Sequence, residues 1–534
     1  MLRLKLKRPM KKKLILGCFL ILVFTHLTAR DEDLWDASVG KFSSLLSLVE
    51  KNYYREVEPD KLVYSSIRGM LETLDPHSYF LDPDSFSRMR EEYTGKYYGL
   101  GIQISKQEDN LVVISPIEGT PASRLGILPG DIISHINGES TKRMSSLEAM
   151  QKLRGPKGTK VTITIVREGL DKPLDLTIER EEIPLRSVPY AFMINDEVGY
   201  IFIRNFAETT SGEFEDRMKL LSEQGMKGLI LDLRRNSGGS FFQSIEISDE
   251  FLAKGDLIVS IKGRNKVYNR ESRAVKDDQY ENIPLVILIN RGSASASEIV
   301  SGAIMDNDRG LIVGEDSWGK GLVQTVFPLG DSLAVALTTA KYYTPSGRSI
   351  QRDYGHIEDY ILYKKAPEEQ REVRYTAKGR KVLGQGGITP DYEVSSTLAP
   401  LTAELMIRGA FFSYARKFVG HQTGLSKSYI FPRGEEKAGD SSMEKIPVGK
   451  DFVVDVRVVE DFKDYLRLNK TAFDEAKFKE SEAEIKRELE REIVSSLWGI
   501  EAGTKVYLKT DAVVLRALEV MPEAAKLVEN TNSR

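Results

Sequence analysis

Cysteine is almost absent from this 534-residue sequence: Cys18 is the only one, and it lies in the N-terminal stretch. Disulfides, thiol catalysis and cysteine–zinc sites are therefore excluded beyond that stretch. Histidine is also scarce, with five residues, and the net charge of −3 shows no basic excess. A nucleic-acid partner, which favours a strongly basic surface, is not expected. Apolar (41%) and charged (29%) residues occur in the proportions of an ordinary globular protein.

The N-terminus departs from this average. A basic head precedes the apolar run "LILGCFLILVFTHL". A run of about 14 residues is short for a membrane-spanning helix but fits a signal peptide. We predict a signal peptide or N-terminal anchor over residues 1–29, and hence export to the periplasm or to the outer face of the cytoplasmic membrane. Cleavage after Ala29 would place Leu27 at a poorly suited position, so an uncleaved anchor and membrane association stay open.

Cys18 lies in "LGC", which resembles a lipoprotein acylation box. The apolar run continues from Phe19 to Leu27, whereas in such boxes the cysteine ends the run. Lipidation is therefore not expected.

Beyond the leader, changes of pattern predict four regions. Residues 30–90 have helical apolar spacing, and residues 91–182 have short strands and turns. Residues 183–394 alternate strands with helices, which indicates βαβ units. Residues 395–534 are charged and mostly helical, with a short β segment expected between 444 and 459. The role of this last region is not predicted.

The segment 91–182 resembles a PDZ domain in the order of its strands and helices, from "YYGLGIQISK" through the hairpin signal Asn137-Gly138 to "KVTITIVREG". Its glycines would let consecutive N–H groups point at a peptide carboxylate while the adjacent strand edge pairs with the peptide. The predicted carboxylate-binding residues are Gly99, Leu100, Gly101 and Ile102. Taken in isolation, the glycines would be better explained as shaping a hairpin.

Three serines stand in "GSASASEI", between an apolar strand pattern and a helical one. A serine nucleophile needs a base, and none of the five histidines has a context that indicates a triad, although the sequence does not exclude one. Lys320, in "SWGKG", is the other available base. Its pKa, ordinarily about 10.4, would have to fall by several units, and a pocket with Trp318 and apolar strands would favour this. The alternative is a solvated lysine on a turn.

The same segment, "GEDSWGKG", approaches a phosphate-binding P-loop. Gly321 stands where Ser or Thr would hold magnesium, two acidic residues would repel phosphate, and the strand pattern "LVQTVF" replaces the required helix. A nucleotide site is rejected.

Together these segments resemble the carboxy-terminal processing peptidases, or tail-specific proteases. The resemblance depends on "LDPHS", "GLGIQI", "LRGPKGT", "DLRRNSGG", "GSASASEI", "GEDSWGKGLVQT" and "YYTPSGRSIQ", in family order. It implies an α/β protease core, crotonase/ClpP-like, with an inserted β-rich PDZ domain and helical N- and C-terminal regions. It also implies a Ser–Lys dyad without metal or cofactor.

The resemblance assigns the site residues. Ser295, the first serine of "SASE", is the implied nucleophile, Lys320 the base, and Gln324 the residue that orients the lysine amine. Ser293 lies outside the motif, and Ser297 would be about 200° further around a helix. An oxyanion hole would use the N–H of Ala296, at a helix start, and by resemblance that of Gly238. Ser237 stands where the family commonly has proline, and Asp306, which matches a family acid, is expected to be structural.

The sequence therefore predicts an exported serine endopeptidase that binds the free C-terminus of protein or peptide substrates and cleaves them through an acyl-enzyme. A non-catalytic PDZ adaptor on a protease-like fold is the alternative. An α/β acyltransferase or esterase is a weaker one, because no G-x-S-x-G elbow is present. Substrate identity, any activator and homo-oligomer formation stay open.

Overall fold

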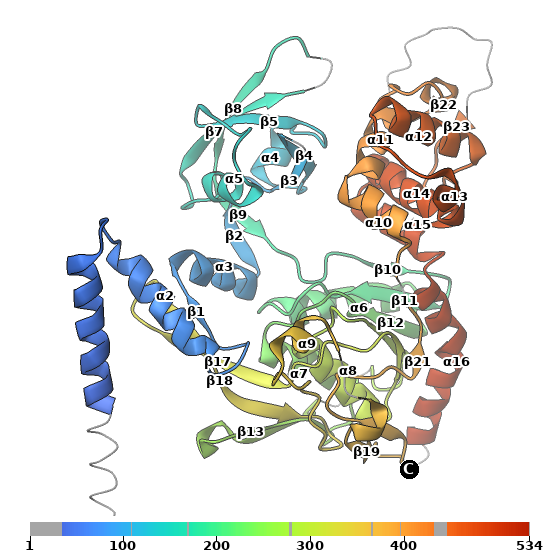
Figure 1. The fold of residues 1–534 in the computed structure, drawn as a ribbon. Coiled ribbons are helices and arrows are strands. Elements are labelled where there is room, and N and C mark those ends of the chain that lie inside the picture. The colour runs from blue at the N-terminus through green and yellow to red at the C-terminus, as the bar shows by residue number, and fades with distance from the viewer. Residues whose placement is uncertain are drawn as a thin grey trace, which may run out of the picture. The chain divides into compact units, whose positions relative to one another are not determined.

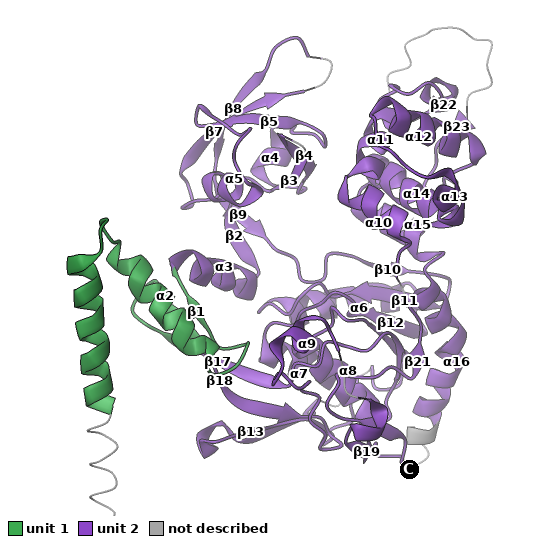
Figure 2. Ribbon diagram, viewed as in Figure 1, with its two compact units in different colours: residues 1–82, 327–336 green, residues 83–326, 337–534 purple. Residues whose placement is uncertain are grey.

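The computed structural model describes residues 35–107, 109–167, 170–276, 280–364, 367–395, 397–431 and 446–532. The chain divides into two compact units, one of residues 1–82 with 327–336 and one of residues 83–326 with 337–534 (Figure 2). The predicted leader lies outside the described residues. Within the described ranges, no helix combines the length and the apolar character needed to cross a membrane.

In its described residues before position 83, the first unit is mainly helical and ends in a short strand. Residues 35–52 are helical, α2 spans Pro59–Glu72, and β1 spans Tyr79–Leu81. β1 pairs antiparallel with the first residues of β18 (Ala334–Tyr343). The Asp75 carboxylate accepts the N–H groups of His77 and Ser78, both at 2.8 Å, so the "LDPHS" motif forms a hydrogen-bonded turn before β1.

A six-stranded sheet is the centre of the second unit (Figure 1). Its strands are, in spatial order, β10 (Ala191–Met193), β11 (Val198–Phe202), β12 (Gly228–Asp232), β15 (Leu285–Ile289), β16 (Leu311–Gly314) and β21 (Tyr392–Glu393). β10 runs antiparallel to β11, and the other neighbours are parallel. The helices α6 (Thr210–Glu223), α7 (Phe241–Asp249) and α8 (Ala296–Asp306) lie in the crossovers. The α/β expectation is confirmed; the crotonase/ClpP-like likeness stays a prediction.

Both faces of this sheet are covered. Leu229, Leu231 and Ile287 belong to the apolar cluster that includes the side chains of α6, α7 and α8. The alternate residues, such as Ile230 and Val286, pack instead with α16 (Ala512–Asn532). Burial on both faces explains why these strands read as continuous apolar runs rather than alternating ones.

A second sheet holds β13 (Leu257–Gly263), β14 (Arg270–Arg273), β17 (Leu322–Pro328) and β18. β18 pairs with β17 and, through its last residues, with β13. The shorter elements of this part are η1 (Lys266–Tyr268), α9 (Ile357–Ile361), η2 (Glu368–Gln370), β19 (Val373–Tyr375) and β20 (Lys381–Leu383).

The PDZ segment forms its own sheet, in the order β3 (Ile102–Gln107), β4 (Asn110–Pro116), β5 (Ile132–Ile136), β7 (Lys160–Val166) and β8 (Leu174–Glu179), with β6 (Glu139–Ser140) beside β5. Its helices are α4 (Pro121–Arg124) and α5 (Ser146–Leu153). Asn137 (φ 49°) and Gly138 (φ 81°) form the predicted hairpin turn. β3 is an edge strand. α3 (Pro83–Thr94) precedes β2 (Lys96–Gly99), which pairs with β9 (Glu181–Pro184).

Before α16, the C-terminal region is a helical bundle with an aromatic core that includes Phe411, Tyr414 and Phe462. Its elements are α10 (Pro400–Ile407), α11 (Ala410–Val419), η3 (Ser426–Ser428), β22 (Tyr429–Ile430), β23 (Ile446–Pro447), α12 (Val456–Leu468), α13 (Glu475–Glu480), α14 (Glu482–Trp498) and α15 (Ile500–Leu508). The expected β segment over 444–459 is only partly realised. The Asp455 carboxylate accepts the N–H groups of Arg457 and Val458 and so begins α12.

Candidate active site

The turn between β15 and α8 presents Ser295. This residue is the N-cap of α8 and has φ 54° and ψ −110°, a positive-φ conformation outside the left-handed helical region that non-glycine residues rarely adopt. Such a backbone costs about 1–3 kcal/mol and persists only where its surroundings hold it. Strain of this kind clusters at functional sites and marks Ser295 as a candidate.

The three serines of "SASAS" differ in burial and bonding. Ser293 and Ser297 are both 0% exposed. The Ser293 hydroxyl donates to the Leu233 carbonyl and the Ser297 hydroxyl to the Asn236 carbonyl, each at 2.8 Å. Ser295 is only half-buried. The outer two serines therefore tie the turn to the neighbouring "DLRRNSGG" loop, and Ser295 is the one of the three whose side chain is not fully buried.

That neighbouring loop brings Gly238 against the nucleophile. A Cβ placed on Gly238 would lie 2.8 Å from the Ser295 Cβ and 3.1 Å from the Ala296 nitrogen, so these three predicted residues are together. The Gly238 N–H, however, donates to the Asn236 Oδ1 at 2.9 Å. Within the described ranges the Ala296 N–H has no acceptor. Of the two predicted oxyanion donors, one is therefore engaged and one is open.

The predicted base lies on the loop between β16 and β17. Its backbone is fastened on several sides: the Trp318 N–H donates to the Ser293 carbonyl at 2.8 Å, and the Gly321 N–H donates to Gln351 Oε1 at 2.8 Å. A Cβ on Gly319 would lie 2.6 Å from the Arg352 Cγ, which explains the glycine there. Lys320, half-buried, thus belongs to a loop that contacts the nucleophile turn directly.

Gln324 follows on β17 and is half-buried. Its Nε2 donates to the Thr338 hydroxyl on β18 at 3.1 Å. The side chain is therefore oriented by the next strand.

Glu298, to which the sequence reasoning gave no role, joins the two halves of the site. It is 0% exposed. Its Oε2 accepts the N–H groups of Ser295 (2.8 Å) and Lys320 (2.9 Å). Its Oε1 accepts the Gly319 N–H (2.6 Å) and the Ser317 hydroxyl (2.5 Å). One carboxylate therefore holds both the nucleophile turn and the base loop.

Four donors around two oxygens match an ionised carboxylate. Burial raises the pKa of Glu298 to about 7, against the opposing effect of these hydrogen bonds. The spacing Ser295-x-x-Glu298 at a helix start is the signal that could have found this residue, because it is a capping-box pattern.

Aromatic side chains cover the base loop. The Arg352 guanidinium lies 4.6 Å from the Trp318 ring centroid and 4.3 Å from that of Tyr363. It also donates to the Trp318 carbonyl at 2.5 Å. The loop is therefore held by cation–π contacts of the Arg352 guanidinium with these rings and not, among the described residues, by an ion pair of Arg352 with a carboxylate.

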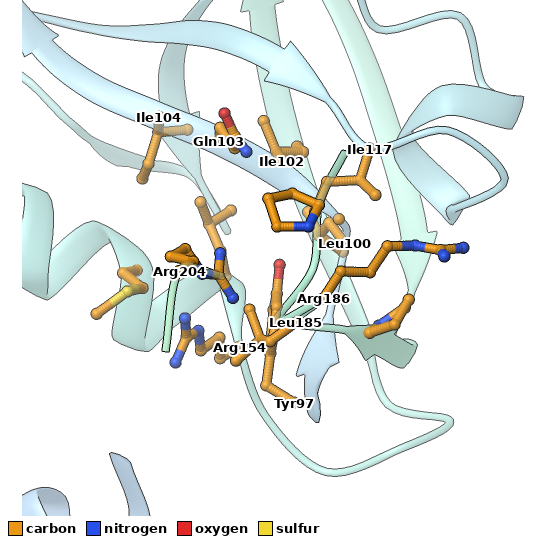
Figure 3. A pocket seen from close by; sticks show the side chains of 15 residues that line it. Tyr97, Leu100, Ile102, Gln103, Ile104, Ile117, Arg154, Leu185, Arg186 and Arg204 are labelled. Atoms are coloured by element: carbon orange, nitrogen blue, oxygen red, sulfur yellow. The ribbon is translucent and has the colours of Figure 1, made fainter. Parts of the chain in front are cut away.

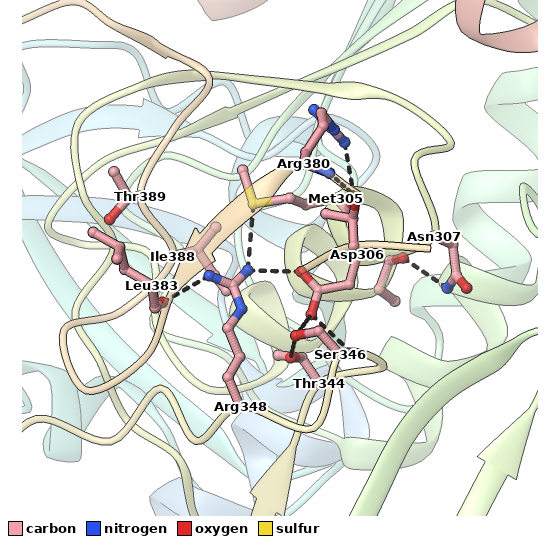
Figure 4. A network of polar contacts seen from close by, with 12 residues as sticks. Met305, Asp306, Asn307, Thr344, Ser346, Arg348, Arg380, Leu383, Ile388 and Thr389 are labelled. Carbon is pink, nitrogen blue, oxygen red and sulfur yellow. Dashed lines mark hydrogen bonds and ion pairs between the residues drawn. The ribbon is translucent and has the colours of Figure 1, made fainter. Parts of the chain in front are cut away.

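Asp306 lies at the far end of α8 and forms a separate buried network (Figure 4). It pairs with Arg348 at 2.7 Å, both side chains being 0% exposed, and it accepts the Ser346 hydroxyl at 2.6 Å. Arg348 also donates to the Leu383 carbonyl. These contacts join α8 to the segments that follow β18, which is the work of a structural residue.

The PDZ loop lines a cavity of about 430 Å³ (Figure 3). Its apolar lining includes Leu100, Ile102 and Ile104 and, from α5, Met150 and Leu153. Among the described residues, the N–H groups of Leu100 and Gly101 have no acceptor. Three arginines also line the cavity, and no Asp or Glu does: Arg154, Arg186 and Arg204.

A strained, half-buried serine before a helix, a glycine loop beside it and a lysine loop bound to it form a candidate site for a serine peptidase on an α/β fold. Comparison with known proteins agrees. Residues 197–362 match Peptidase family S41, residues 89–166 match the PDZ domain, and residues 25–85 match the Activating protease CtpB N-terminal domain.

The chain is 38% identical over 384 residues to the carboxy-terminal-processing protease of Bartonella bacilliformis, covering 70% of this chain and 88% of that protein. It is 36% identical to the carboxy-terminal processing protease CtpA of Bacillus subtilis, over 59% of this chain and 67% of the relative. A solved photosystem II D1 C-terminal processing protease is similar at 27% identity, with a TM-score of 0.36, over 68% and 94% of the two chains. The chain belongs to the carboxy-terminal processing protease family, which are serine-type peptidases of family S41 with a PDZ domain.

Proposed function

We propose that this chain is an exported endopeptidase that captures the C-terminal tail of a protein substrate in its PDZ groove and cleaves a peptide bond through Ser295 and Lys320. The observation that carries the proposal is the Glu298 carboxylate, which binds the backbone N–H groups of both residues. A single buried group thus fixes the spacing between the proposed nucleophile and the proposed base.

In the proposed reaction, the neutral Lys320 amine takes the proton of the Ser295 hydroxyl as its oxygen attacks the substrate carbonyl. The tetrahedral intermediate expels the amine of the leaving segment, which receives that proton from Lys320. Water then attacks the acyl-Ser295 ester, with Lys320 again as base, and releases the new C-terminus. Gln324 orients the lysine amine.

The oxyanion that forms needs N–H donors. The Ala296 N–H is open and lies at the N-terminus of α8, where the helix dipole favours negative charge. The Gly238 N–H would have to exchange its bond to Asn236 Oδ1 for one to the oxyanion. This exchange is part of the proposal: substrate binding completes the hole.

For the tail, the open N–H groups of Leu100 and Gly101 support capture of a carboxylate, and the edge strand β3 supports pairing with the residues before it. Of the arginines in the lining, Arg154 already pairs with Glu91, and Arg186 and Arg204 favour an anionic ligand. The substrate class is therefore proteins or peptides with a free, unfolded C-terminus.

A serine-reactive fluorophosphonate probe tests the chemistry. We expect the wild type to be labelled at one site and the Ser295→Ala variant to stay unlabelled. A PDZ adaptor without catalysis would bind tail peptides but show no labelling and no cleavage. Labelling at another serine would refute the assignment.

Export is supported by the basic head and apolar run of residues 1–29. A reporter fused after residue 60 should be found outside the cytoplasmic membrane, and deletion of residues 1–29 should retain it inside. A full-length fusion that stays in the cytoplasm would refute export without affecting the proposed chemistry.

A further inference from the structure

Three charged side chains, two of them from the "DLRRNSGG" segment and one from the residue before α16, form a buried cluster. Arg234 donates through Nε and Nη2 to Asp232 and through Nη1 to both oxygens of Asp511, at 3.2 and 2.9 Å. The exposed fractions of the side chains are 12% for Arg234, 3% for Asp232 and 7% for Asp511. The Tyr200 hydroxyl also donates to Asp232, at 2.7 Å.

The cluster holds one more carboxylate than it needs for neutrality. Asp232 already neutralises Arg234, and burying a second carboxylate carries a desolvation cost that an ion pair seldom fully returns. Stabilisation of the fold by this ion pair is therefore, by itself, a weak explanation for a second buried carboxylate at position 511. What Asp511 adds is geometric, because it fixes the Nη1 edge of a guanidinium whose other edge is held by Asp232.

Asp511 is also the residue that begins α16. Its Oδ1 accepts the N–H groups of Val513 (2.9 Å) and Val514 (3.2 Å). α16 in turn packs along the face of the central sheet opposite α6, α7 and α8. The carboxylate is thus rigidly placed by the C-terminal region, which had no assigned role.

Arg234 leads directly into the loop beside the nucleophile. Two residues later, the Asn236 carbonyl accepts the Ala294 N–H (3.0 Å) and the Ser297 hydroxyl (2.8 Å), and Asn236 Oδ1 accepts the Gly238 N–H (2.9 Å). A displacement of Arg234 would therefore reach the residues on both sides of Ser295.

We propose that Asp511 is a positioning residue for catalysis: by clamping Arg234, the C-terminal region holds the 233–239 loop in register with Ser295. The proposal rests on the proposed peptidase function. According to this proposal, α16 contributes to the geometry of the catalytic site.

Asp511→Asn is the variant of choice. Asparagine caps a helix as well as aspartate does, and the Arg234–Asp232 pair remains, so no buried charge is left alone. Asp455→Asn is the control. Asp455 also caps a helix of the C-terminal region and pairs with an arginine, Arg457, at 2.5 Å, and among the described residues it has no hydrogen bond or ion pair with the 233–239 loop. This pair is more exposed than that of Asp511 and Arg234, so the variant controls for the loss of a charged cap and an ion pair and not for burial.

Purified full-length proteins are compared by kcat, KM, rate of fluorophosphonate labelling and Tm. We expect Asp511→Asn to lower kcat and the labelling rate about tenfold to a hundredfold, as misplacement of a reacting group does, with KM little changed. Asp455→Asn should leave both rates at the wild-type value. In an Arg234→Lys background, which already loses the forked contact, adding Asp511→Asn should lower kcat no further.

Wild-type rates for Asp511→Asn, or an equal loss of rate for Asp455→Asn at equal Tm, would overturn the proposal. Additive losses in the Arg234→Lys background would overturn it as well, because the two residues would then act separately. A wild type that neither reacts with the probe nor cleaves would instead refute the proposed function itself.

Discussion

Around Ser295, backbone N–H groups are taken up by the protein itself: Glu298 binds three of them, and Asn236 Oδ1 binds that of Gly238. In the PDZ loop, the N–H groups of Leu100 and Gly101 have no acceptor in the part of the chain that the structure describes. Apart from the open Ala296 N–H, the candidate active site is thus cross-linked internally, whereas the groove leaves the N–H groups of Leu100 and Gly101 for a ligand. Pre-organisation favours catalysis, and open donors on an edge strand favour binding of varied tails.

The largest effect is expected from removing the proposed dyad. Ser295→Ala and Lys320→Ala should each lower kcat by about 10⁴-fold or more, and the double variant should lose little beyond either one, since the pair acts as a unit. Cleavage of a tailed protein substrate, with Tm as a check on folding, measures this.

Ser297→Ala is the matched control. It removes a buried hydroxyl that bonds Asn236, so it should lower stability by about 1 kcal/mol while keeping most of the activity. An inactive Ser297→Ala beside an active Ser295→Ala would reverse the assignment.

The next effect concerns the carboxylate that cross-links the centre. Glu298→Gln places an amide where four donors converge, so kcat should fall by about tenfold or more.

Because burial raises the pKa of Glu298 from 4.5 to about 7, the folded state binds a proton between these two pH values that the unfolded state does not bind. Unfolding free energy of the wild type should therefore decline as pH rises from 4.5 to 7, by about 3 kcal/mol, and level off above 7.

Denaturant unfolding of both proteins between pH 5 and 8 isolates this contribution, because other groups titrate alike in the two. A wild-type minus Glu298→Gln difference in unfolding free energy that is flat with pH would contradict the predicted titration of Glu298.

The kcat of the wild type should rise toward alkaline pH as Lys320 loses its proton. A rate that is flat between pH 6 and 9, under conditions where chemistry is rate-limiting, would count against a lysine base.

The last expected effect lies in the groove, and it concerns KM rather than kcat. Amidating the C-terminus of a peptide substrate should raise KM about tenfold to a hundredfold, the equivalent of 1.5–3 kcal/mol for charged hydrogen bonds. Capture alone leaves kcat unchanged, whereas a tail that also repositions the PDZ domain would lower kcat. Peptides too short to reach the groove should be cut equally as acid and amide, and equal cleavage of long acid and amide substrates would remove the groove from the mechanism.

Modifying the substrate is a cleaner test than modifying the loop. Gly101 has φ 77°, and a Cβ there would lie 2.3 Å from the Thr120 side chain, so a larger residue would distort the domain as well as its donors.

Much of this architecture could be predicted from the sequence, because it depends on patterns among residues that are close together in the chain. Continuous apolar runs marked the strands of the central sheet, the Asn137-Gly138 pair marked a hairpin, and glycines marked close backbone contact beside Lys320. The family motifs singled out Ser295, and burial of Ser293 and Ser297 adds an independent physical reason for that choice.

What the sequence did not reveal depends on contacts between distant segments. From the sequence, Glu298 is explained by a helix capping box. Its hydrogen bond to the loop that carries Lys320 is visible only in the structure, where the residue is buried. The valines before residue 460 alternate like a strand, yet Asp455 begins a helix there. Asp511 and Arg234 are 277 residues apart, and no spacing rule joins them.

That separation has a consequence for how the protein is made. Until synthesis has passed α16, the sheet face that carries Ile230 and Val286 lacks its cover, and Arg234 lacks one of its two carboxylates. Contacts this far apart in the chain form slowly, because a long loop must close first. A partly synthesised chain therefore contains Ser295 and Lys320 but not the packing around the loop beside them, so on the proposal made above we expect proteolytic activity only after α16 has docked.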